Sequence, residues 1–509
     1  MSPASNIIEL LTNGADDAPA LMAPGRSSLT YAGLRNQVDA TVGRLNAFGI
    51  GRNTTVAMVL PNGPEMAGAF ISVAAGATTA PLNPAYRQDE FEFYLQDLQA
   101  QLLIVQKDVD TPAIAAAENL GIDIAILEVA ADNPAGAFEL TANVSANPVA
   151  SNQGGMAERD DTALVLHTSG TTSRPKIVPL SQRNICSSAA NIAESIGLTA
   201  DDRCLNIMPL FHIHGLIAAV LSSLHAGASI CCTPGFNALQ FFDLLQKVAP
   251  TWYTAVPTMH QAILGRAGRN RDIVQAARLR LIRSSSASLP PAVMTKLEET
   301  FATPVIEAYG MTEAAHQMAC NPMPPGRQKP GSVGVAAGPE VAIMNESGTL
   351  LPDGEIGEIV IRGDNVMAGY RNNETANASA FTNGWFRTGD QGRFDADGYL
   401  SLTGRLKEII NRGGEKISPR EIDEVLLEHP AVAQIVTFAV PHDKLGEDVA
   451  AAVVLEDGAS VSEREIRQYA AKRLADFKVP RKVLFLEEIP KGATGKLQRI
   501  GLAEKLGLA

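Results

Sequence analysis

The sequence predicts an α/β protein with a large N-terminal domain of layered sheets and helices. Short apolar runs at 55–60, 102–105 and 163–167 are each followed by turn residues and then by an amphipathic segment. This alternation is typical of largely parallel sheets covered by helices. The 509 residues, 46% of them hydrophobic, are also enough for more than one packed core.

The remaining elements follow in chain order. The region 128–160 is rich in Ala, Asn and Gly and has little periodicity, which predicts a surface excursion. Strand-turn-strand spacing over 341–361 predicts a small antiparallel β subdomain. Charged residues become more frequent near Gly404, where we place the boundary to a small α+β C-terminal domain. Its expected elements are a helix at 419–429, strands near 432–440 and 449–455, and a helix at 461–475.

Composition and charge exclude several classes of protein. Lys and Arg total 42 against 55 for Asp and Glu, a net charge of −13, which disfavours broad binding to nucleic acids or anionic membranes. Five irregularly spaced cysteines without a CxxC predict reduced thiols rather than a disulfide framework or a zinc site. The N-terminus lacks the regions of a signal peptide, and no apolar run approaches the roughly 20 residues that span a bilayer. We therefore expect a cytoplasmic protein with no nucleic-acid or membrane partner. The sequence does not distinguish between a monomer and a small homo-oligomer.

A loop rich in hydroxyl groups follows the apolar run at 163–167. Its sequence is TSGTTSRPK, from Thr168 to Lys176. Backbone N–H groups, hydroxyls and the lysine can together wrap a polyphosphate, although an ordinary Ser/Thr-rich turn has the same composition. A Walker A loop is excluded because Pro175 precedes the lysine and Ile177 follows it.

This loop and four later motifs resemble those of the adenylate-forming superfamily, which contains acyl-CoA synthetases, luciferases and peptide-synthetase adenylation domains. The superfamily signature is TSGTTGxPK, and this chain departs from it once, with Ser173 in place of glycine. The other motifs occur in the superfamily's order and are YGMTE (309–313), WFRTGD (385–390), GRLKE (404–408) and GATGK (492–496). The resemblance covers about residues 25–500.

The resemblance implies a carboxylate that attacks the α-phosphate of ATP and a coenzyme A thiol that then attacks the acyl-adenylate. Thr312 would touch the α-phosphate, and Glu313 would bind Mg²⁺ together with substrate phosphates. Tyr309 would lie against the adenine, and Asp390 and Arg405 would hold the ribose. The residues implied at the β- and γ-phosphates are Thr168, Ser169, Gly170, Thr171, Thr172 and Lys176.

The resemblance also assigns roles near the C-terminus. Lys496 would stabilise charge that develops as the acyl-adenylate forms. Lys407 lies at the superfamily's hinge, so the implied domains are 1–403, a hinge at 404–408 and a mobile domain at 409–509. Rotation at the hinge would bring Gly413 and Gly414 to the coenzyme A approach, where backbone without side chains can come close to the pantetheine arm.

The segments that line the acid pocket in the superfamily are unusually polar here. The sequence has PLFHIHG at 209–215, RSSSASL at 283–289 and AAH at 314–316. Such groups would serve a long apolar acid poorly, because they would be buried without partners, but would serve a small dicarboxylate well. Together with 251–258, these details resemble the oxalate–CoA ligases of plants and fungi. The residues then expected to contact oxalate are His214, Ser286, Ser288 and His316.

Three alternatives remain open from the sequence. The same fold could act on a short- or medium-chain fatty acid or an aryl acid. The chain could bind adenylates without catalysis, although its intact motif lysines and acids argue against this. It could also transfer the acyl group to a separate carrier protein, although no carrier domain is attached.

Overall fold

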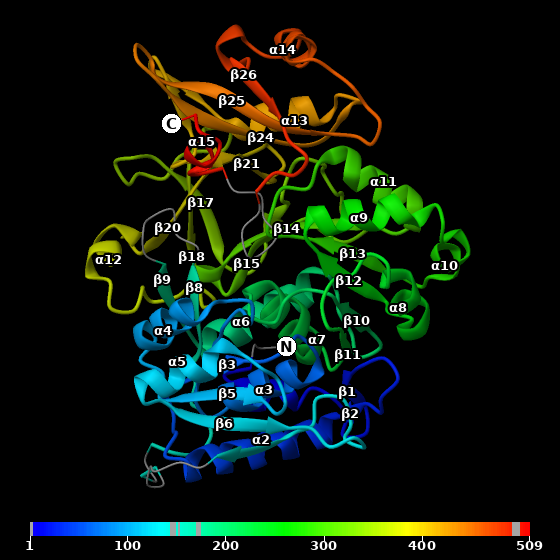
Figure 1. Cartoon of the computed structure of the whole chain (residues 1–509), viewed down its shortest axis with the longest axis vertical. Coiled ribbons are helices and arrows are strands. Elements are labelled where there is room, and N and C mark those ends of the chain that lie inside the picture. Colours follow the sequence, from blue (N-terminus) through cyan, green and yellow to red (C-terminus); the bar gives the residue numbers. More distant parts are fainter. Residues whose placement is uncertain (1–3, 143–148, 151–152, 169–174, 491–498, 509) are drawn as a thin grey trace.

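The computed structural model contains four sheets and describes all residues except 1–3, 143–148, 151–152, 169–174, 491–498 and 509 (Figure 1). Two large sheets lie in the N-terminal region, and both are mostly parallel, as predicted. The nine-stranded sheet has the order β16 (Val335–Ala336), β15 (His316–Cys320), β14 (Val305–Met311), β13 (Leu281–Ser284), β12 (Trp252–Ala255), β10 (Arg203–Asn206), β11 (Ser229–Cys232), β1 (Pro19–Met22) and β2 (Leu29–Thr30). The seven-stranded sheet has the order β7 (Glu139–Ala142), β6 (Asp123–Glu128), β5 (Leu102–Gln106), β3 (Thr55–Val59), β4 (Thr78–Pro81), β8 (Thr162–Thr168) and β9 (Lys176–Ser181).

Helices cover these sheets and account for the amphipathic segments of the sequence. They are α1 (Ile7–Leu11), α2 (Tyr31–Ala47), α3 (Pro64–Ala74), α4 (Gln88–Asp97), α5 (Pro112–Leu120), α6 (Gln182–Ser195), the π-helix η1 (His214–Leu221), α7 (Ser222–His225), α8 (Phe241–Val248), α9 (Pro257–Ala267), α10 (Arg271–Ala276), α11 (Pro291–Phe301) and the 3₁₀ turn η2 (Thr312–Ala314). None of the helices in the described part of the chain is long and apolar enough to cross a membrane.

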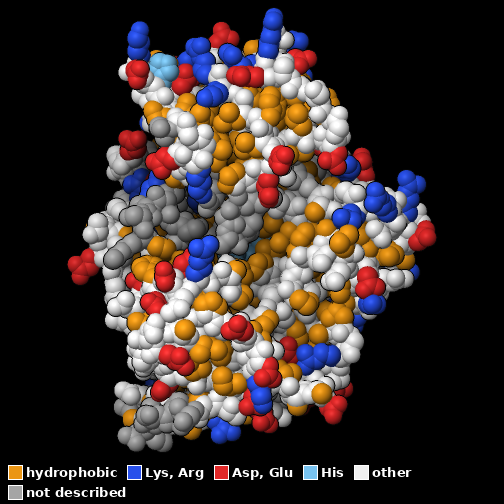
Figure 2. Space-filling view, viewed as in Figure 1, with side chains coloured by type: hydrophobic (Ala, Val, Ile, Leu, Met, Phe, Trp, Pro, Cys, Tyr) orange, Lys and Arg blue, Asp and Glu red, His pale blue; other side chains and the backbone are white. Residues whose placement is uncertain are grey.

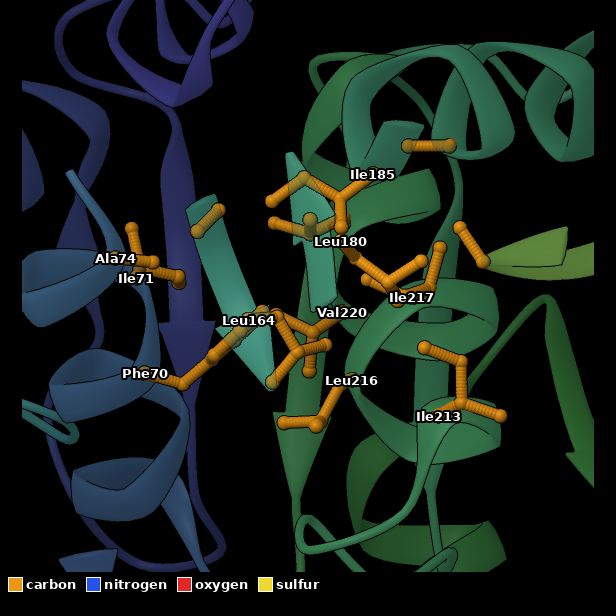
Figure 3. Close-up of a cluster of buried hydrophobic side chains, with 14 of the residues drawn as sticks. Phe70, Ile71, Ala74, Leu164, Leu180, Ile185, Ile213, Leu216, Ile217 and Val220 are labelled. Carbon is orange, nitrogen blue, oxygen red and sulfur yellow. The ribbon is translucent and has the colours of Figure 1, made fainter. Parts of the chain in front are cut away.

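A continuous apolar core joins the two large sheets. Side chains of α3, β8 and β9 meet those of α6 and η1, with Leu164 of β8 facing Phe70 on one side and Val220 on the other (Figure 3). Every residue of η1 is buried, because the helix lies between the layers. This packing fixes the helix that begins with His214.

A third sheet is antiparallel and confirms the predicted β subdomain. It contains β17 (Glu340–Met344), β18 (Gly357–Arg362), β19 (Phe381–Thr382), β20 (Trp385–Phe394) and β21 (Leu400–Arg405), and α12 (Glu374–Ala380) lies beside it. In β20 and β21, Asp390 pairs with Arg405 across the ladder. The register of this hairpin therefore sets the distance between two of the predicted ribose contacts.

The C-terminal region forms a fourth sheet with its own apolar clusters, drawn in orange and red at the top of Figure 1. The predicted order of helix, two strands and helix is confirmed. Its elements are β22 (Ile410–Arg412), β23 (Glu415–Ile417), α13 (Pro419–Leu427), β24 (Val432–His442), β25 (Gly446–Leu455), α14 (Glu463–Ala471), η3 (Asp476–Lys478), β26 (Lys482–Phe485) and α15 (Leu502–Lys505).

The prediction of a surface excursion at 128–160 was partly wrong. The segment contains β7, which pairs antiparallel with β6, and Ala135, Phe138 and Leu140 are buried in the main core. The short alternation of apolar and polar residues around β7 is the signal of a half-buried edge strand, and its Ala- and Gly-rich flanks concealed it.

Candidate active site

The predicted phosphate loop connects two antiparallel strands. Thr168, the last residue of β8, pairs with Lys176, the first residue of β9. Ser169, Gly170, Thr171 and Thr172 lie outside the described residues. The structure thus places the two ends of the loop side by side at the ends of the strands, and the phosphate contacts stay a prediction.

Lys176, Tyr370 and Glu313 form a compact cluster next to this loop. The Lys176 ammonium lies 4.3 Å from the centroid of the Tyr370 ring. The Tyr370 hydroxyl donates a hydrogen bond of 2.9 Å to Glu313 Oε1. Tyr370 is 8% exposed and Glu313 is 7% exposed. Tyr370 was not among the sequence-predicted residues, because a tyrosine 57 positions from its partner carries no local signal.

Burial shifts the pKa values of two charged groups in this cluster. It raises the pKa of the Glu313 carboxyl, against the opposing effects of hydrogen bonds and nearby cations. Burial also lowers the pKa of Lys176, and repulsion from Lys407 lowers it further. A buried carboxylate of this kind gains from a cation beside it. No group of three or more His, Cys, Asp or Glu side chains close enough to hold a metal occurs in the described part of the chain. A single buried carboxylate fits Mg²⁺ that is bound mainly by phosphate oxygens and water, and the binding of Mg²⁺ by Glu313 stays a prediction.

A strained turn separates Glu313 from His316. Ala315 and His316 both have positive φ, 47° and 105°, which are uncommon for residues with a side chain and cost about 1–3 kcal/mol each. Asn365 is buried and donates to the carbonyls of Ala314 (2.8 Å) and Gln317 (2.9 Å), so it holds the turn from both sides. A Cβ on Gly310 would lie 1.8 Å from the His316 carbonyl, so only glycine permits this close approach.

Tyr309, Asp390 and Arg405 converge from two sheets. The Tyr309 hydroxyl donates to Asp390 Oδ2, and Arg405 Nε donates to Asp390 Oδ1 at 2.9 Å. Asp390 is buried, and the Arg405 side chain is half-exposed. The neighbouring carboxylate raises the pKa of Arg405 above its ordinary value, so the guanidinium stays charged. These contacts orient the tyrosine ring and the carboxylate at the place where adenine and ribose are predicted.

The structure also places the predicted hinge and thiolation residues. Lys407 is exposed, and the amide of the preceding Leu406 donates to the Gly389 carbonyl at 2.9 Å. Gly413 and Gly414 form the tip of the β22–β23 hairpin with φ of 59° and 97°, the left-handed conformation that favours glycine in a two-residue hairpin. Lys496 lies outside the described residues. The roles of the hinge, the glycine pair and this lysine stay predictions.

Three of the four residues predicted to contact the acid lie together. His214 Nδ1 is 3.0 Å from Ser286 Oγ, and the rings of His214 and His316 lie 5.0 Å apart between centroids. Both histidines are almost fully buried, whereas Ser286 is partly exposed and has a φ of 73°. Ser288 follows in the same loop, and its side chain makes no hydrogen bond with another residue that the structure describes. The structure therefore joins His214, Ser286 and His316 and leaves the contact of Ser288 a prediction.

Two more polar residues adjoin this group and were not predicted. His214 Nε2 is 2.6 Å from Thr254 Oγ1 on β12, and Arg283 Nη1 on β13 is 3.5 Å from the same oxygen. Arg283 is fully buried, and its Nη2 donates to Gln317 Oε1 at 3.1 Å. No carboxylate forms an ion pair with Arg283 among the described residues. Burial lowers its pKa to about 10, so it remains a cation at neutral pH. The sequence signal that could have identified Arg283 as a site residue is the presence of an arginine within an apolar strand.

Two residues of the predicted site lie at one edge of the nine-stranded sheet. The space-filling view shows a depression between the lobe of the C-terminal sheet and the lobe that carries α9 and α11 (Figure 2). Ser286 follows β13, and Glu313 follows β14, so both lie after the carboxyl ends of neighbouring parallel strands. Ligands of open α/β sheets bind at this edge.

Comparisons with known proteins define the class. The sequence model of the AMP-binding enzyme matches residues 11–371, and that of the AMP-binding enzyme C-terminal domain matches residues 421–496. The chain belongs to the AMP-binding enzyme family, and the predicted superfamily is thereby confirmed. The predicted domain boundary falls between the two matches and stays a prediction.

Several individual proteins are similar to this chain over most of its length. An oxalate–CoA ligase from Arabidopsis thaliana is 46% identical over 503 residues, which cover 97% of both chains. An oxalate–CoA ligase from Saccharomyces cerevisiae is 43% identical and covers 89% of this chain and 87% of its own. Among solved structures, ATP-bound MatB from Rhodopseudomonas palustris superposes with a TM-score of 0.87 at 29% identity over 98% of both chains. The predicted fold class is confirmed by this similarity.

Proposed function

We propose that the chain is an ATP-dependent acid–CoA ligase that converts oxalate into oxalyl-CoA with release of AMP and diphosphate. The observation that carries the acid assignment is the polar group at His214, Ser286 and His316, with the buried cation Arg283 behind it. A fatty or aryl chain placed here would lie against polar side chains and a buried cation and would offer them no hydrogen-bond acceptor, whereas a carboxylate would. The two oxalate–CoA ligases at 43–46% identity support the same acid.

The first half-reaction needs positioning and charge neutralisation more than an acid or a base. Lys176 and the loop after Thr168 would hold the β- and γ-phosphates, and Asp390 with Arg405 would hold the ribose. Glu313 would bind Mg²⁺, which when bound neutralises charge on the phosphates. Thr312 would lie at the α-phosphate, where one carboxylate of oxalate attacks and diphosphate leaves.

In the second half-reaction the coenzyme A thiol attacks the acyl carbon and AMP leaves. Rotation at Lys407 would withdraw Lys496 and bring Gly413 and Gly414 towards the pantetheine arm. The exposed glycine hairpin supports this role, because its tip has no side chains to obstruct a narrow substrate. All five cysteines are buried and free of disulfides, which supports the proposed cytoplasmic location.

The test is diphosphate release with purified protein, ATP, Mg²⁺ and coenzyme A across a panel of acids. The panel contains oxalate, malonate, acetate, octanoate and 4-coumarate. Oxamate is the matched control, because it replaces one carboxylate of oxalate by a neutral amide of the same size. Loss of a hydrogen-bonded charge predicts a kcat/KM for oxamate about 10- to 100-fold below that for oxalate. Preference for octanoate or 4-coumarate would refute the acid assignment and leave the ATP-site argument intact.

A further inference from the structure

A chain of hydrogen bonds connects the buried guanidinium of Arg283 to the hydroxyl of Ser286. Arg283 Nη1 lies 3.5 Å from Thr254 Oγ1, which lies 2.6 Å from His214 Nε2. On the other side of the ring, His214 Nδ1 lies 3.0 Å from Ser286 Oγ. Arg283, Thr254 and His214 have no exposed surface, whereas Ser286 is partly exposed. The chain thus runs from the interior to the surface of the predicted acid pocket.

The chemistry of Arg283 and Thr254 determines which group donates in the first two hydrogen bonds of this chain. Arginine can only donate, so Thr254 Oγ1 accepts from Arg283. The threonine hydroxyl has one hydrogen of its own, and His214 Nε2 is its available acceptor among the residues that the structure describes. A fully buried hydroxyl hydrogen without an acceptor is costly. Thr254 therefore donates to His214 Nε2.

This donation decides the tautomer of His214. Its Nε2 uses a lone pair to accept from Thr254, so the ring hydrogen lies on Nδ1. Nδ1–H then donates to Ser286 Oγ, and the hydrogen of Ser286 is directed to another acceptor. Apart from His214, no residue in the described part of the chain forms a hydrogen bond with Ser286 Oγ. The serine hydroxyl is thereby prepared to donate into the pocket.

Gln317 keeps Arg283 in this position. Its Oε1 accepts from Arg283 Nη2, while its Nε2 lies within hydrogen-bond distance of Asn191 O, Ser195 Oγ and Ala337 O. These three partners set the orientation of the amide, so its oxygen faces the guanidinium. Arg283 is consequently held as a donor towards Thr254.

We propose that Arg283 and Thr254 are positioning residues that hold His214 as the Nδ1–H tautomer, so that Ser286 donates a hydrogen bond to the distal carboxylate of the acid. A carboxylate accepts hydrogen bonds and cannot donate them, so a pocket that selects a dianion needs donors already in place. The identity of the acid rests on the proposed function. The tautomer is a property of the protein without substrate.

The tautomer can be measured directly on the whole protein. Long-range ¹H–¹⁵N correlation spectra of protein labelled with ¹⁵N at histidine distinguish protonated from unprotonated ring nitrogens, and His214→Asn identifies the signals of His214. The expected result at neutral pH is a protonated Nδ1 and an unprotonated Nε2. A protonated Nε2 in the wild-type protein would overturn the proposal, whichever acid the enzyme uses.

Two substitutions test whether the His214 tautomer affects recognition of the acid. Thr254→Val keeps the shape of the side chain and removes its hydroxyl, so the Nδ1–H tautomer should lose its dominance, and Arg283→Met should have the same effect by removing the donor. The KM for oxalate should rise about tenfold or more in both variants, because a hydrogen bond to a charged group is lost, while the KM for ATP changes less than about twofold.

Thr254→Ser is the matched control and should restore both the tautomer and the KM for oxalate. Equal increases in the KM for oxalate and for ATP in Thr254→Val would show a merely structural role and overturn the proposal. If the tautomer is as expected but the acid panel favours another acid, the proposed function fails while the hydrogen-bond arrangement stands. The two failures are thus distinguishable.

Discussion

Removal of one hydroxyl, in Tyr370→Phe, tests whether Glu313 binds the metal. The tyrosine oxygen lies 2.9 Å from Glu313 Oε1, and both side chains are more than nine-tenths buried, so solvent screens this contact little. Phenylalanine retains the ring beneath Lys176. The change therefore isolates one hydrogen bond to a charged group, which contributes about 1.5–3 kcal/mol.

The expected result is a roughly 10- to 100-fold higher KM for MgATP, which corresponds to the free energy of this one hydrogen bond. The hydroxyl lowers the pKa of the Glu313 carboxyl, so its removal raises that pKa further. A proton then competes more effectively with Mg²⁺, and the increase in KM should be larger at pH 6 than at pH 8. The assay is diphosphate release at saturating acid and coenzyme A, with MgATP varied at both pH values.

Tyr399→Phe is the matched control. Its ring also lies beneath a lysine, with Lys329 Nζ 4.1 Å from the centroid, and its hydroxyl also donates a hydrogen bond, of 2.7 Å to the Arg327 carbonyl. It makes no contact with Glu313 among the described residues. The control should leave the KM for MgATP within about twofold, the range expected away from a site. An unchanged KM in Tyr370→Phe, or the same increase at both pH values, would refute the metal assignment.

Three further predictions concern the acid pocket, the C-terminal domain and a buried carboxyl group. His316→Ala should raise the KM for oxalate about tenfold while sparing that for ATP, from loss of one polar contact; equal rises would show a structural residue. Lys496→Ala should slow adenylate formation about 100-fold or more while sparing thiolysis of supplied oxalyl-adenylate, and equal loss of both steps would contradict its role. Burial raises the pKa of Glu307 from 4.5 to about 7, although the hydrogen bond that the carboxyl accepts from the Leu289 amide acts in the opposite direction. Between these values the unfolded chain has lost a proton that the native protein retains, so this group opposes folding increasingly as pH rises. Glu307→Gln should therefore gain stability relative to wild type, by up to about 3 kcal/mol at pH 8 and little at pH 4, measured by urea unfolding; a pH-independent difference would refute the argument.

Short sequence motifs, and the resemblance that they carry, were sufficient to predict which side chains gather at the proposed adenine and ribose site. The predicted adenine and ribose residues Tyr309, Asp390 and Arg405 lie in three separate motifs, and the structure brings their side chains into contact. The sequence could not show that one Asp390 carboxylate joins the other two, because that contact depends on the pairing of β20 with β21 and on the packing of two sheets. Tyr370 was missed for the same reason.

The residues predicted to contact the acid show what a sequence pattern could not predict. Three consecutive serines, 284–286, suggested a pocket lined by hydroxyls. In the structure Ser284 and Ser285 are fully buried, and the Ser285 hydroxyl donates to the Ala308 carbonyl at 2.8 Å. Only Ser286, which follows the end of β13 and has a positive φ, reaches His214. Alternation of side chains along a strand and the turn after it thus separate identical residues into different roles.

The sequence by itself determined the α/β class, the order of the motifs predicted to bind the nucleotide and the polar character of the segments predicted to line the acid pocket. These properties reside in periodicity and in short contiguous stretches, which need no knowledge of the fold. The tertiary structure alone decided that Thr254, Arg283 and His214, from β12, β13 and η1, share one hydrogen-bond chain. Hydrogen bonds act over about 3 Å, so only the register of the two strands and the packing of η1 between the sheets can bring these distant residues within reach.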